Sequence, residues 1–370
     1  MTSLCRPEQG SRRSVPRSPC DPPPMSDFAQ TGLICTLQRL NETHLARLEA
    51  ELTELASARP IALVLPCHGM DLEKAALAGI VAELQGAAFL REIVVTLNGV
   101  DEITFALAQE RFKPLPQRVT FLWNDRPGTA PPALSGKGGN AAAAFAHLVA
   151  HAECEIVATQ DCDVASFRRV DLARLCYAVA HPQLGYRFAK MYYSRVTDRL
   201  YGRVSRLFLA PLLHAVVRVA GHVPLVDFLL SFRYPLAGEV AMTRELAASL
   251  RTHAGWGLEI GQLCEVFRHV DPREVCQVDG GTGYDHKHQP ATTALAAMAA
   301  EIARELFAQL AAEGLPHDLA FRTSITRAYR HEAAHALRRS ASLALINGLP
   351  FDDASESAIV AAFAARLEAG

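Results

Sequence analysis

The sequence predicts an α/β fold, an open and mostly parallel sheet with helices on both faces, joined to a mainly helical region. Between residues 61 and 163, apolar strand-like runs alternate four times with helical patterns. Such alternation is typical of parallel sheets covered on both faces. The runs are continuously apolar, as in strands buried on both sides. From residue 291 onward the chain is rich in alanine and has helical periodicity, which predicts a helical end.

The first half is expected to begin with an amphipathic helix over 37–58 that Pro60 stops. Continuous apolar runs then mark the strands, and apolar residues at helical spacing mark the helices. Strands are predicted at 61–68, 92–99, 119–124 and 156–163, and helices at 72–90, 103–112 and 137–154. Ligands of such sheets bind beyond the carboxyl ends of the strands. The polar residues expected there are Pro66, Cys67, His68, Asn98, Asn124, Asp161 and Asp163.

The second half is less regular, and its predicted elements are mixed. They are a helix at 172–180, a strand at 184–191, a basic amphipathic region at 192–219, a loop or strand entry at 231–242, helices at 246–252 and 256–267, and a strand at 275–278. Three helices, at 291–313, 324–344 and 356–367, are expected to finish the chain. Their apolar faces fit either packing on the chain's own domain or the contact of a homodimer.

Composition excludes several classes of protein. A net charge of -2 over 370 residues argues against bulk binding to nucleic acid or a membrane surface. The nine cysteines form no CxxC pair, which favours a reducing compartment over a disulfide framework or zinc site. Residues 1–27 are rich in Pro, Ser and Arg and lack an apolar segment, so we expect a disordered extension, with Met25 as an alternative start. The predicted location is cytoplasmic.

Asp161 and Asp163 end the apolar run that begins at Ile156. If the strand continues through them, both side chains point to one side, where they can share a cation. Mg²⁺ or Mn²⁺ fits, because hard divalent ions prefer oxygen ligands and keep open positions for phosphates. The alternative is a turn in which both side chains bond nearby backbone N–H groups.

Four other features are candidates for chemistry. Lys137 lies between glycines where a helix starts, which favours an anion; an ordinary glycine turn is the alternative. Glu259 begins another helix, where a carboxylate is stabilised. Arg203, Ser205 and Arg206 lie within one turn and could bind a small anion, although surface arginines are commoner. His286 could complete a metal site or belong to a solvated loop.

Several motifs agree in order and spacing with one family. They are Gly136-Lys137-Gly138, Asp161-Cys162-Asp163, Gly202-Arg203-Val204-Ser205, Pro235-Leu236-Ala237-Gly238-Glu239, Gly255-Trp256-Gly257-Leu258-Glu259-Ile260-Gly261 and the late His286. Over about 61–300 the chain resembles the glucosyl-3-phosphoglycerate synthases and their mannosyl relatives, retaining glycosyltransferases of the Rossmann-like GT-A fold.

The resemblance implies a role for each of these residues. Asp161, Asp163 and His286 would hold Mg²⁺ or Mn²⁺, with Asp163 the more direct ligand. Glu259 and Lys137 would be catalytic. Donor binding would fall to Pro66, Cys67, His68, Asn98, Lys137 and Asp161, and acceptor binding to Gly202, Arg203, Ser205 and His288. Residues 28–170 would form the half that binds the nucleotide sugar, 171–290 the acceptor half, and 291–370 a C-terminal helical region.

The function implied is metal-dependent transfer of glucose, with retention, from UDP- or GDP-glucose to 3-phosphoglycerate. The donor loop departs from the family, since it reads Pro66-Cys67-His68-Gly69-Met70-Asp71. Transfer of mannose or another hexose to a different anionic acceptor is therefore an alternative. A nucleotidyltransferase is another, although the glycine-rich, arginine-containing loop it usually has after the first strand is missing. A sugar-nucleotide-binding protein without catalysis is the third.

Overall fold

The computed structural model describes residues 30, 32–128, 136–151, 153–283 and 292–369. Residues 32–370 form one compact unit. The extension expected at 1–27 lies outside the described residues, so its predicted disorder stays a prediction. No helix in the described part of the chain has the length and apolar character needed to span a membrane.

The described residues contain one sheet of eight strands, in the order β1-β8-β6-β7-β5-β2-β3-β4. The strands are β1 (Cys35–Leu37), β2 (Ile61–His68), β3 (Leu90–Asn98), β4 (Arg118–Trp123), β5 (Ile156–Thr159), β6 (Phe188–Ser194), β7 (Val240–Thr243) and β8 (Val275–Thr282). Only β7 runs antiparallel to its neighbours, β5 and β6. The predicted mostly parallel sheet is confirmed.

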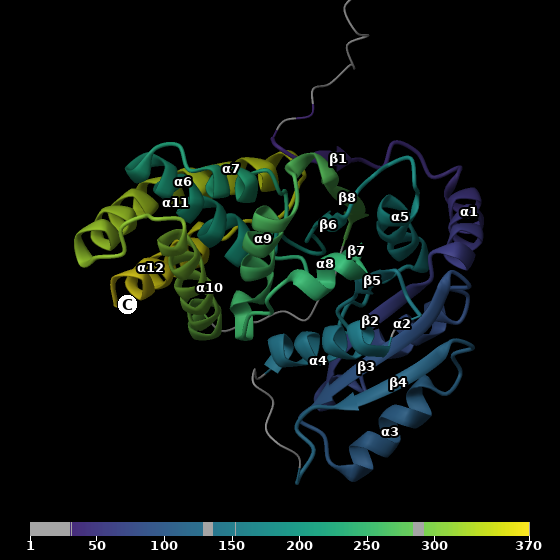
Figure 1. The fold of residues 1–370 in the computed structure, drawn as a ribbon. Helices are drawn as coiled ribbons and strands as arrows, with labels where there is room; N and C mark the ends of the chain where they lie inside the picture. The colour runs from purple at the N-terminus through teal and green to yellow at the C-terminus, as the bar shows by residue number, and fades with distance from the viewer. Residues whose placement is uncertain (1–29, 31, 129–135, 152, 284–291, 370) are drawn as a thin grey trace, which may run out of the picture. The chain divides into compact units, whose positions relative to one another are not determined.

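Helices cover both faces of this sheet (Figure 1). In β2, Ile61, Leu63 and Leu65 face one apolar core, while Ala62 and Val64 face the other, because successive side chains of a strand point to opposite faces. The first core is completed by α1 (Leu45–Ala58), α2 (Ala75–Leu84), α3 (Glu102–Phe112) and α5 (Arg169–Ala180). The second core receives α4 (Gly136–His151), α8 (Arg244–Ser249) and α9 (Leu258–His269).

The second core extends into a helical region. It consists of a π-helix (Val204–Leu209), α6 (Ala210–Ala220), α7 (Pro224–Leu230), α10 (Thr292–Ala312), α11 (Leu319–Ile346) and α12 (Asp353–Ala369). The buried Tyr329 of α11 donates a hydrogen bond from its hydroxyl to the Leu207 carbonyl at 2.8 Å. The ring of Phe208 packs against Tyr329 and Phe363. The C-terminal helices therefore pack directly on the π-helix.

Two helix predictions need correction. The helix expected at 37–58 begins at Leu45, because residues 35–37 form the short edge strand β1 paired with β8. Three residues are too few to show a strand pattern. The helix expected at 72–90 is only α2, since Leu90 already belongs to β3. Between them, Gly86 accommodates the Arg169 guanidinium, which would collide with a Cβ at this position.

Three strand predictions also need correction. The strand expected at 156–163 ends at Thr159, so Asp161 and Asp163 lie in the turn that follows. The idea that both point to one side of an extended strand was wrong. The strand expected at 184–191 is β6, displaced by three to four residues, and the strand expected at 275–278 continues to Thr282.

Candidate functional site

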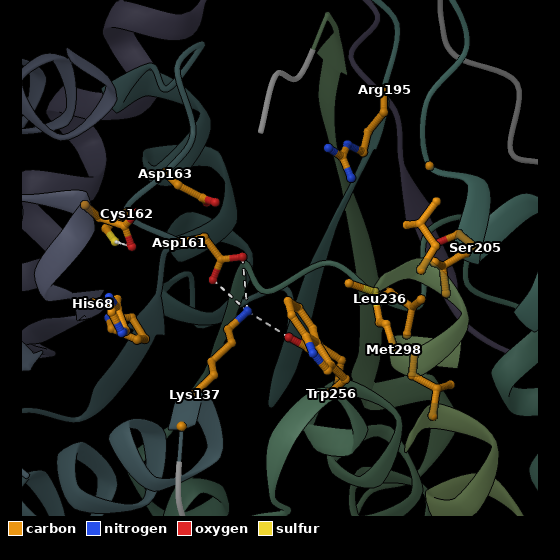
Figure 2. A pocket seen from close by; sticks show the side chains of 18 of the residues that line it. His68, Lys137, Asp161, Cys162, Asp163, Arg195, Ser205, Leu236, Trp256 and Met298 are labelled. Carbon is orange, nitrogen blue, oxygen red and sulfur yellow. Dashed lines mark hydrogen bonds and ion pairs between the residues drawn. The ribbon is translucent and has the colours of Figure 1, made fainter. Parts of the chain in front are cut away.

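A cavity of about 440 Å³ lies at the carboxyl ends of β5, β2 and β3 (Figure 2). It extends from there to the π-helix and to α10. Its lining includes Pro66, Cys67, His68, Met70, Asp71, Asn98, Lys137, Asn140, Asp161, Cys162, Asp163, Tyr193, Arg195, Tyr201, Gly202, Arg203, Ser205, Tyr234, Leu236, Trp256, Glu259 and Met298. The cavity therefore joins both halves predicted from the sequence.

Lys137 connects two carboxylates at the centre of this cavity. Its Nζ lies 2.8 Å from Asp161 Oδ1 and 2.8 Å from Glu259 Oε1. Dashed lines in Figure 2 mark the contact of Lys137 with Asp161. Burial works to lower the pKa of Lys137, but Asp161 and Glu259 raise it well above the usual range. The ammonium group is therefore charged at every physiological pH, and it neutralises part of the paired negative charge.

This ion pair rests against a glycine. A Cβ on Gly238 would lie 2.5 Å from Asp161 Oδ1 and 2.7 Å from Lys137 Nζ. Only a residue without a side chain lets the backbone approach so closely. At the other side, Gly136 begins α4 with φ +64°, and a Cβ on Gly138 would collide with the His253 carbonyl oxygen. The glycines of two motifs thus explain how Lys137 and Asp161 meet.

The acidic pair fits a divalent metal ion. Asp161 and Asp163 line the same cavity, within the turn after β5. Two carboxylates supply hard oxygen ligands and leave positions for phosphate oxygens. In the described part of the chain, no cluster of three or more His, Cys, Asp or Glu side chains is placed to bind a metal. The third predicted ligand, His286, lies outside the described residues, as does His288.

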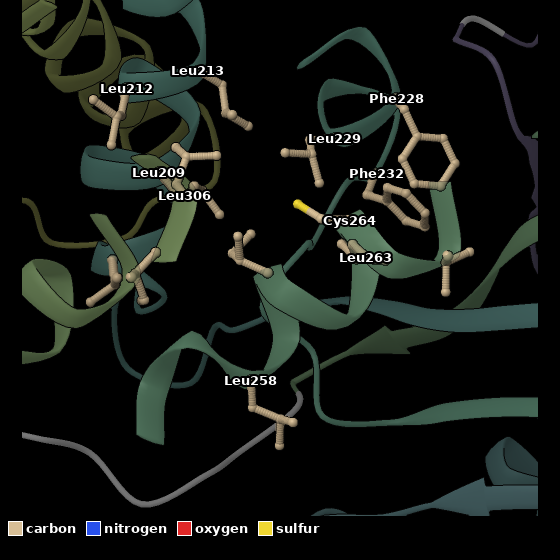
Figure 3. Packing of buried hydrophobic residues seen from close by; sticks show 14 of the residues in the cluster. Leu209, Leu212, Leu213, Phe228, Leu229, Phe232, Leu258, Leu263, Cys264 and Leu306 are labelled. Carbon is tan, nitrogen blue, oxygen red and sulfur yellow. The ribbon is translucent and has the colours of Figure 1, made fainter. Parts of the chain in front are cut away.

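Glu259 is fixed by the packing of α9. A Cβ on Gly257 would lie 2.8 Å from Glu305 Cβ, and a Cβ on Gly261 would collide with the His253 ring. Both glycines let α9 approach its neighbours closely. Figure 3 shows Leu263 and Cys264 of α9 near the apolar side chains of α7, with Leu258 at the other end of the helix. All three belong to the second core. The helix that carries Glu259 is therefore anchored in the second core.

A buried lysine that the sequence analysis missed lies under the loop 236–239. Lys190 of β6 is fully buried, and its Nζ donates to the Ala237 carbonyl oxygen at 2.5 Å. Burial lowers the pKa of Lys190 to about 8, although Glu259 and Glu239 partly oppose this. Thr159 Oγ1 donates to the Gly238 carbonyl oxygen at 2.6 Å. These bonds hold the loop against Asp161.

The predicted acceptor segment leads into the π-helix. Gly202 has φ +67°, and a Cβ on this residue would lie 3.4 Å from Cε2 of the Tyr234 ring. Ser205 is buried, and its Oγ has no hydrogen-bond partner among the described residues. The same holds for Nε of Arg195, whose guanidinium points into the cavity in Figure 2. Buried polar groups normally have partners, so these two are suited to bind a ligand.

The loop predicted to bind the donor is ordered by contacts between β2 and β3. His68 Nδ1 accepts a hydrogen bond from the Met70 N–H at 3.2 Å. A Cβ on Gly99 would lie 2.6 Å from His68 Nε2, so the imidazole packs on the glycine turn after β3. His68 is paired in register with Asn98. The two side chains thus end neighbouring strands at the rim of the cavity.

The structure brings eleven of the thirteen predicted site residues to one cavity. They are Pro66, Cys67, His68, Asn98, Lys137, Asp161, Asp163, Gly202, Arg203, Ser205 and Glu259. Their individual roles stay predictions. Two lining residues that the sequence analysis missed, Tyr193 and Arg195, lie at the carboxyl end of β6, where ligand-binding residues are expected. They were not predicted because this strand was expected to end at residue 191. Met298 belongs to a helix stripe whose spacing predicts only core.

Comparisons with known proteins agree with one another, although no family model matches the chain. A glucosyl-3-phosphoglycerate synthase of Persephonella marina is 34% identical over 359 residues, which cover 93% of this chain and 89% of that protein. An enzyme of the same name from Methanococcoides burtonii is 34% identical over 251 residues, or 64% of this chain and 61% of that protein.

A solved structure is also similar. The glucosyl-3-phosphoglycerate synthase of Mycobacterium tuberculosis, in complex with Mg²⁺ and UDP, superposes with a TM-score of 0.57 at 25% identity. The match covers 77% of this chain and 89% of that one.

Proposed function

The chain belongs to the glucosyl-3-phosphoglycerate synthase family, and we propose that it transfers glucose from UDP-glucose to 3-phosphoglycerate with the help of Mg²⁺ or Mn²⁺. Its fold is the GT-A arrangement of that family. The observation that carries the proposal is one cavity lined by an acidic pair, by a lysine bridging two carboxylates, and by a segment whose buried Ser205 hydroxyl has no partner among the described residues.

On the donor side, Asp161 and Asp163 would hold the metal ion, with His286 as the third protein ligand. When bound, the ion supplies Lewis-acid stabilisation of negative charge on the leaving nucleotide. Lys137 adds a fixed positive charge beside them, which preorganised sites use to stabilise charge that develops in the transition state. Pro66, Cys67, His68 and Asn98 would bind the nucleoside.

Glu259 orients the sugar in this proposal. Its Oε1 bonds to Lys137, and so does Asp161 on the other side of the ammonium group. A carboxylate engaged in this way is a poor nucleophile, so we infer attack on the same face from which the nucleotide leaves. The anomeric configuration would then be retained. Proton NMR of the product decides this, because a β-linked product contradicts it.

On the acceptor side, Arg203 would bind an anionic group of 3-phosphoglycerate, since a guanidinium matches phosphate and carboxylate geometry. Ser205 would donate its hydroxyl, which no described residue engages, to the same ligand. Gly202 would keep the backbone open beside it. His288 would contribute from the loop outside the described residues. Together they would align the attacking hydroxyl near the sugar carbon.

The experiment is a transfer assay with UDP-glucose, GDP-glucose and GDP-mannose, each with and without Mg²⁺, in the presence of 3-phosphoglycerate. We expect product with UDP-glucose only when metal is present. Transfer that is equally fast without metal, or no transfer with any of the donors, contradicts the proposal. Preference for GDP-mannose would instead favour the mannosyl alternative.

We infer the location and the partners of the enzyme from its cysteines and its net charge. The seven cysteines in the described part are free, and six of them are buried. This supports a reducing location such as the cytoplasm. The net charge of -2 supports small-molecule substrates rather than nucleic acid or a membrane as partners. A homodimer stays a prediction that the molar mass in solution tests.

A further inference from the structure

Three asparagine side chains form a hydrogen-bonded chain at the rim of the cavity. Asn98 ends β3, Asn124 follows β4, and Asn140 lies in the second turn of α4. Asn124 Nδ2 donates to Asn140 Oδ1 at 2.6 Å, and Asn140 Nδ2 donates to Asn98 Oδ1 at 2.8 Å. We call these three residues the asparagine relay. Its central member, Asn140, is only 2% exposed and is therefore shielded from water.

Because of the relay, only the NH₂ group of Asn98 is available to a ligand. An amide has an acceptor oxygen and an NH₂ donor, and the oxygen of Asn98 is engaged by Asn140. No described residue accepts a hydrogen bond from Asn98 Nδ2, while the side chain lines the cavity. Because Asn140 is buried and its own oxygen is occupied by Asn124, Asn98 presents a donor toward the ligand.

The position of Asn98 in the sheet indicates which part of a ligand it meets. Along the edge of the sheet the strands follow in the order β5-β2-β3, with Asp161 after β5, His68 at the end of β2 and Asn98 at the end of β3. Neighbouring strands are about 4.8 Å apart, so Asn98 stands two strand spacings from the acidic pair. A nucleoside diphosphate whose phosphates lay at Asp161 and Asp163 would extend along this edge and place its base near Asn98.

We propose that Asn140 and Asn124 are positioning residues that fix Asn98 as a hydrogen-bond donor, so that the site selects a base with a carbonyl acceptor at this edge, uracil over cytosine. The two bases have nearly the same shape, but uracil presents O4 as an acceptor where cytosine presents an NH₂ donor. The inference rests on the proposed function, since it takes the cavity to bind a nucleotide sugar. It goes further by naming the hydrogen bond that distinguishes uracil from cytosine.

The test compares binding of UDP and CDP, with Mn²⁺ present, to wild type and to Asn140→Asp by calorimetry. An aspartate at this position has only acceptors, so Asn98 must turn its NH₂ toward it and present its oxygen to the base. We expect the wild-type preference for UDP over CDP to fall by about tenfold or more, because a matched hydrogen bond becomes a mismatched one. The charge that the substitution adds affects both nucleotides alike, so the ratio is insensitive to it.

Two further variants complete the design. Asn98→Asp presents acceptors directly and should lower the same ratio, which keeps the test decisive if Asn140→Asp fails to fold. Asn347→Asp makes the same chemical change at an exposed position that ends α11, and it should leave the ratio at the wild-type value.

The outcomes separate the two proposals. An unchanged ratio in Asn140→Asp and Asn98→Asp, with UDP still bound, overturns the relay and leaves the glucosyltransferase proposal standing. A wild type that binds UDP and CDP equally also overturns only the relay. A wild type that binds no UDP in the presence of metal overturns both.

Discussion

The two sides of the cavity differ in how their polar groups are satisfied. On the side proposed to bind the donor, Lys137 is bonded to both Asp161 and Glu259, and Asn98 is bonded to Asn140. On the side proposed to bind the acceptor, Ser205 Oγ and Arg195 Nε are buried without hydrogen-bond partners among the described residues. The donor side is thus held in place by the protein itself, whereas the acceptor side has polar groups left for a ligand.

This difference has an energetic consequence. Removing one partner of a buried pair leaves the other unpaired, which costs stability. Removing a group that had no protein partner costs little stability and instead weakens ligand binding. Substitutions on the donor side should therefore affect both folding and every substrate, while substitutions on the acceptor side should affect the acceptor alone.

The largest effect is expected from Asp163→Ala. Loss of one metal ligand removes charge stabilisation of the leaving nucleotide, and we expect the transfer rate to fall by about a thousandfold. Initial rates over a Mg²⁺ titration measure it, with Glu110→Ala on the exposed side of α3 as the control. If the variant keeps wild-type metal dependence, Asp163 is not a ligand and the donor side has been misread.

Gly238→Ala tests whether the donor side depends on close packing. Its Cβ would lie 2.5 Å from Asp161 Oδ1, so the ion pair with Lys137 must shift, and we expect kcat to fall by about a hundredfold. Thermal unfolding should show a lower Tm as well. Gly79→Ala in α2 is the matched control, because nothing lies within 4 Å of its Cβ. Equal activity of the two variants would show that the ion pair tolerates displacement.

Ser205→Ala and Arg203→Ala test the acceptor side. We expect the KM for 3-phosphoglycerate to rise by about tenfold in each, since one hydrogen bond to a charged group is lost. The KM for UDP-glucose and the Tm of Ser205→Ala should stay near wild type. Steady-state kinetics with each substrate varied in turn measure this. An equal rise for donor and acceptor would contradict the division of the cavity.

Lys190 gives the smallest and most specific effect. Its pKa is lowered to about 8, whereas an unfolded lysine has a pKa of about 10.4. Between these values the unfolded state binds more protons, so the contribution of Lys190 to stability rises with pH, by at most about 1.4 kcal/mol per pH unit. Urea unfolding of wild type and Lys190→Met from pH 7 to about 10.5 measures the difference. If the free energies of unfolding of the two proteins stay parallel above pH 8, the pKa of Lys190 is not lowered.

Much of the sheet could be predicted from the sequence. The strand at 61–68 agrees residue by residue with β2, because its apolar run is long and bounded by Pro60 and a glycine turn. The acidic pair and Lys137 could be found because their neighbours are glycines or an apolar strand. Local patterns of this kind carry their own structural meaning.

Other features could not be predicted, because they depend on partners far away in the sequence. Nothing near Lys190 in the sequence reveals that it is buried under Ala237, and β1 is defined only by its pairing with β8. Arg203 and Ser205 stood out as a guanidinium and a hydroxyl within one turn, and through family resemblance, but the π-helix that follows Arg203 has no simple spacing rule and was not predicted. The relay through Asn140 joins residues from three separate elements.

The reversed direction of β7 has a further consequence. Because β6 and β7 are adjacent and antiparallel, residues 195–239 leave and re-enter the sheet at the same edge, as an unusually long hairpin connection. Such a connection can change in length or sequence without altering the register of the strands that flank it. The proposed acceptor residues Gly202, Arg203 and Ser205 all lie in this one connection, so we expect changes within it to alter acceptor binding first, as long as Gly238 beside Asp161 is kept.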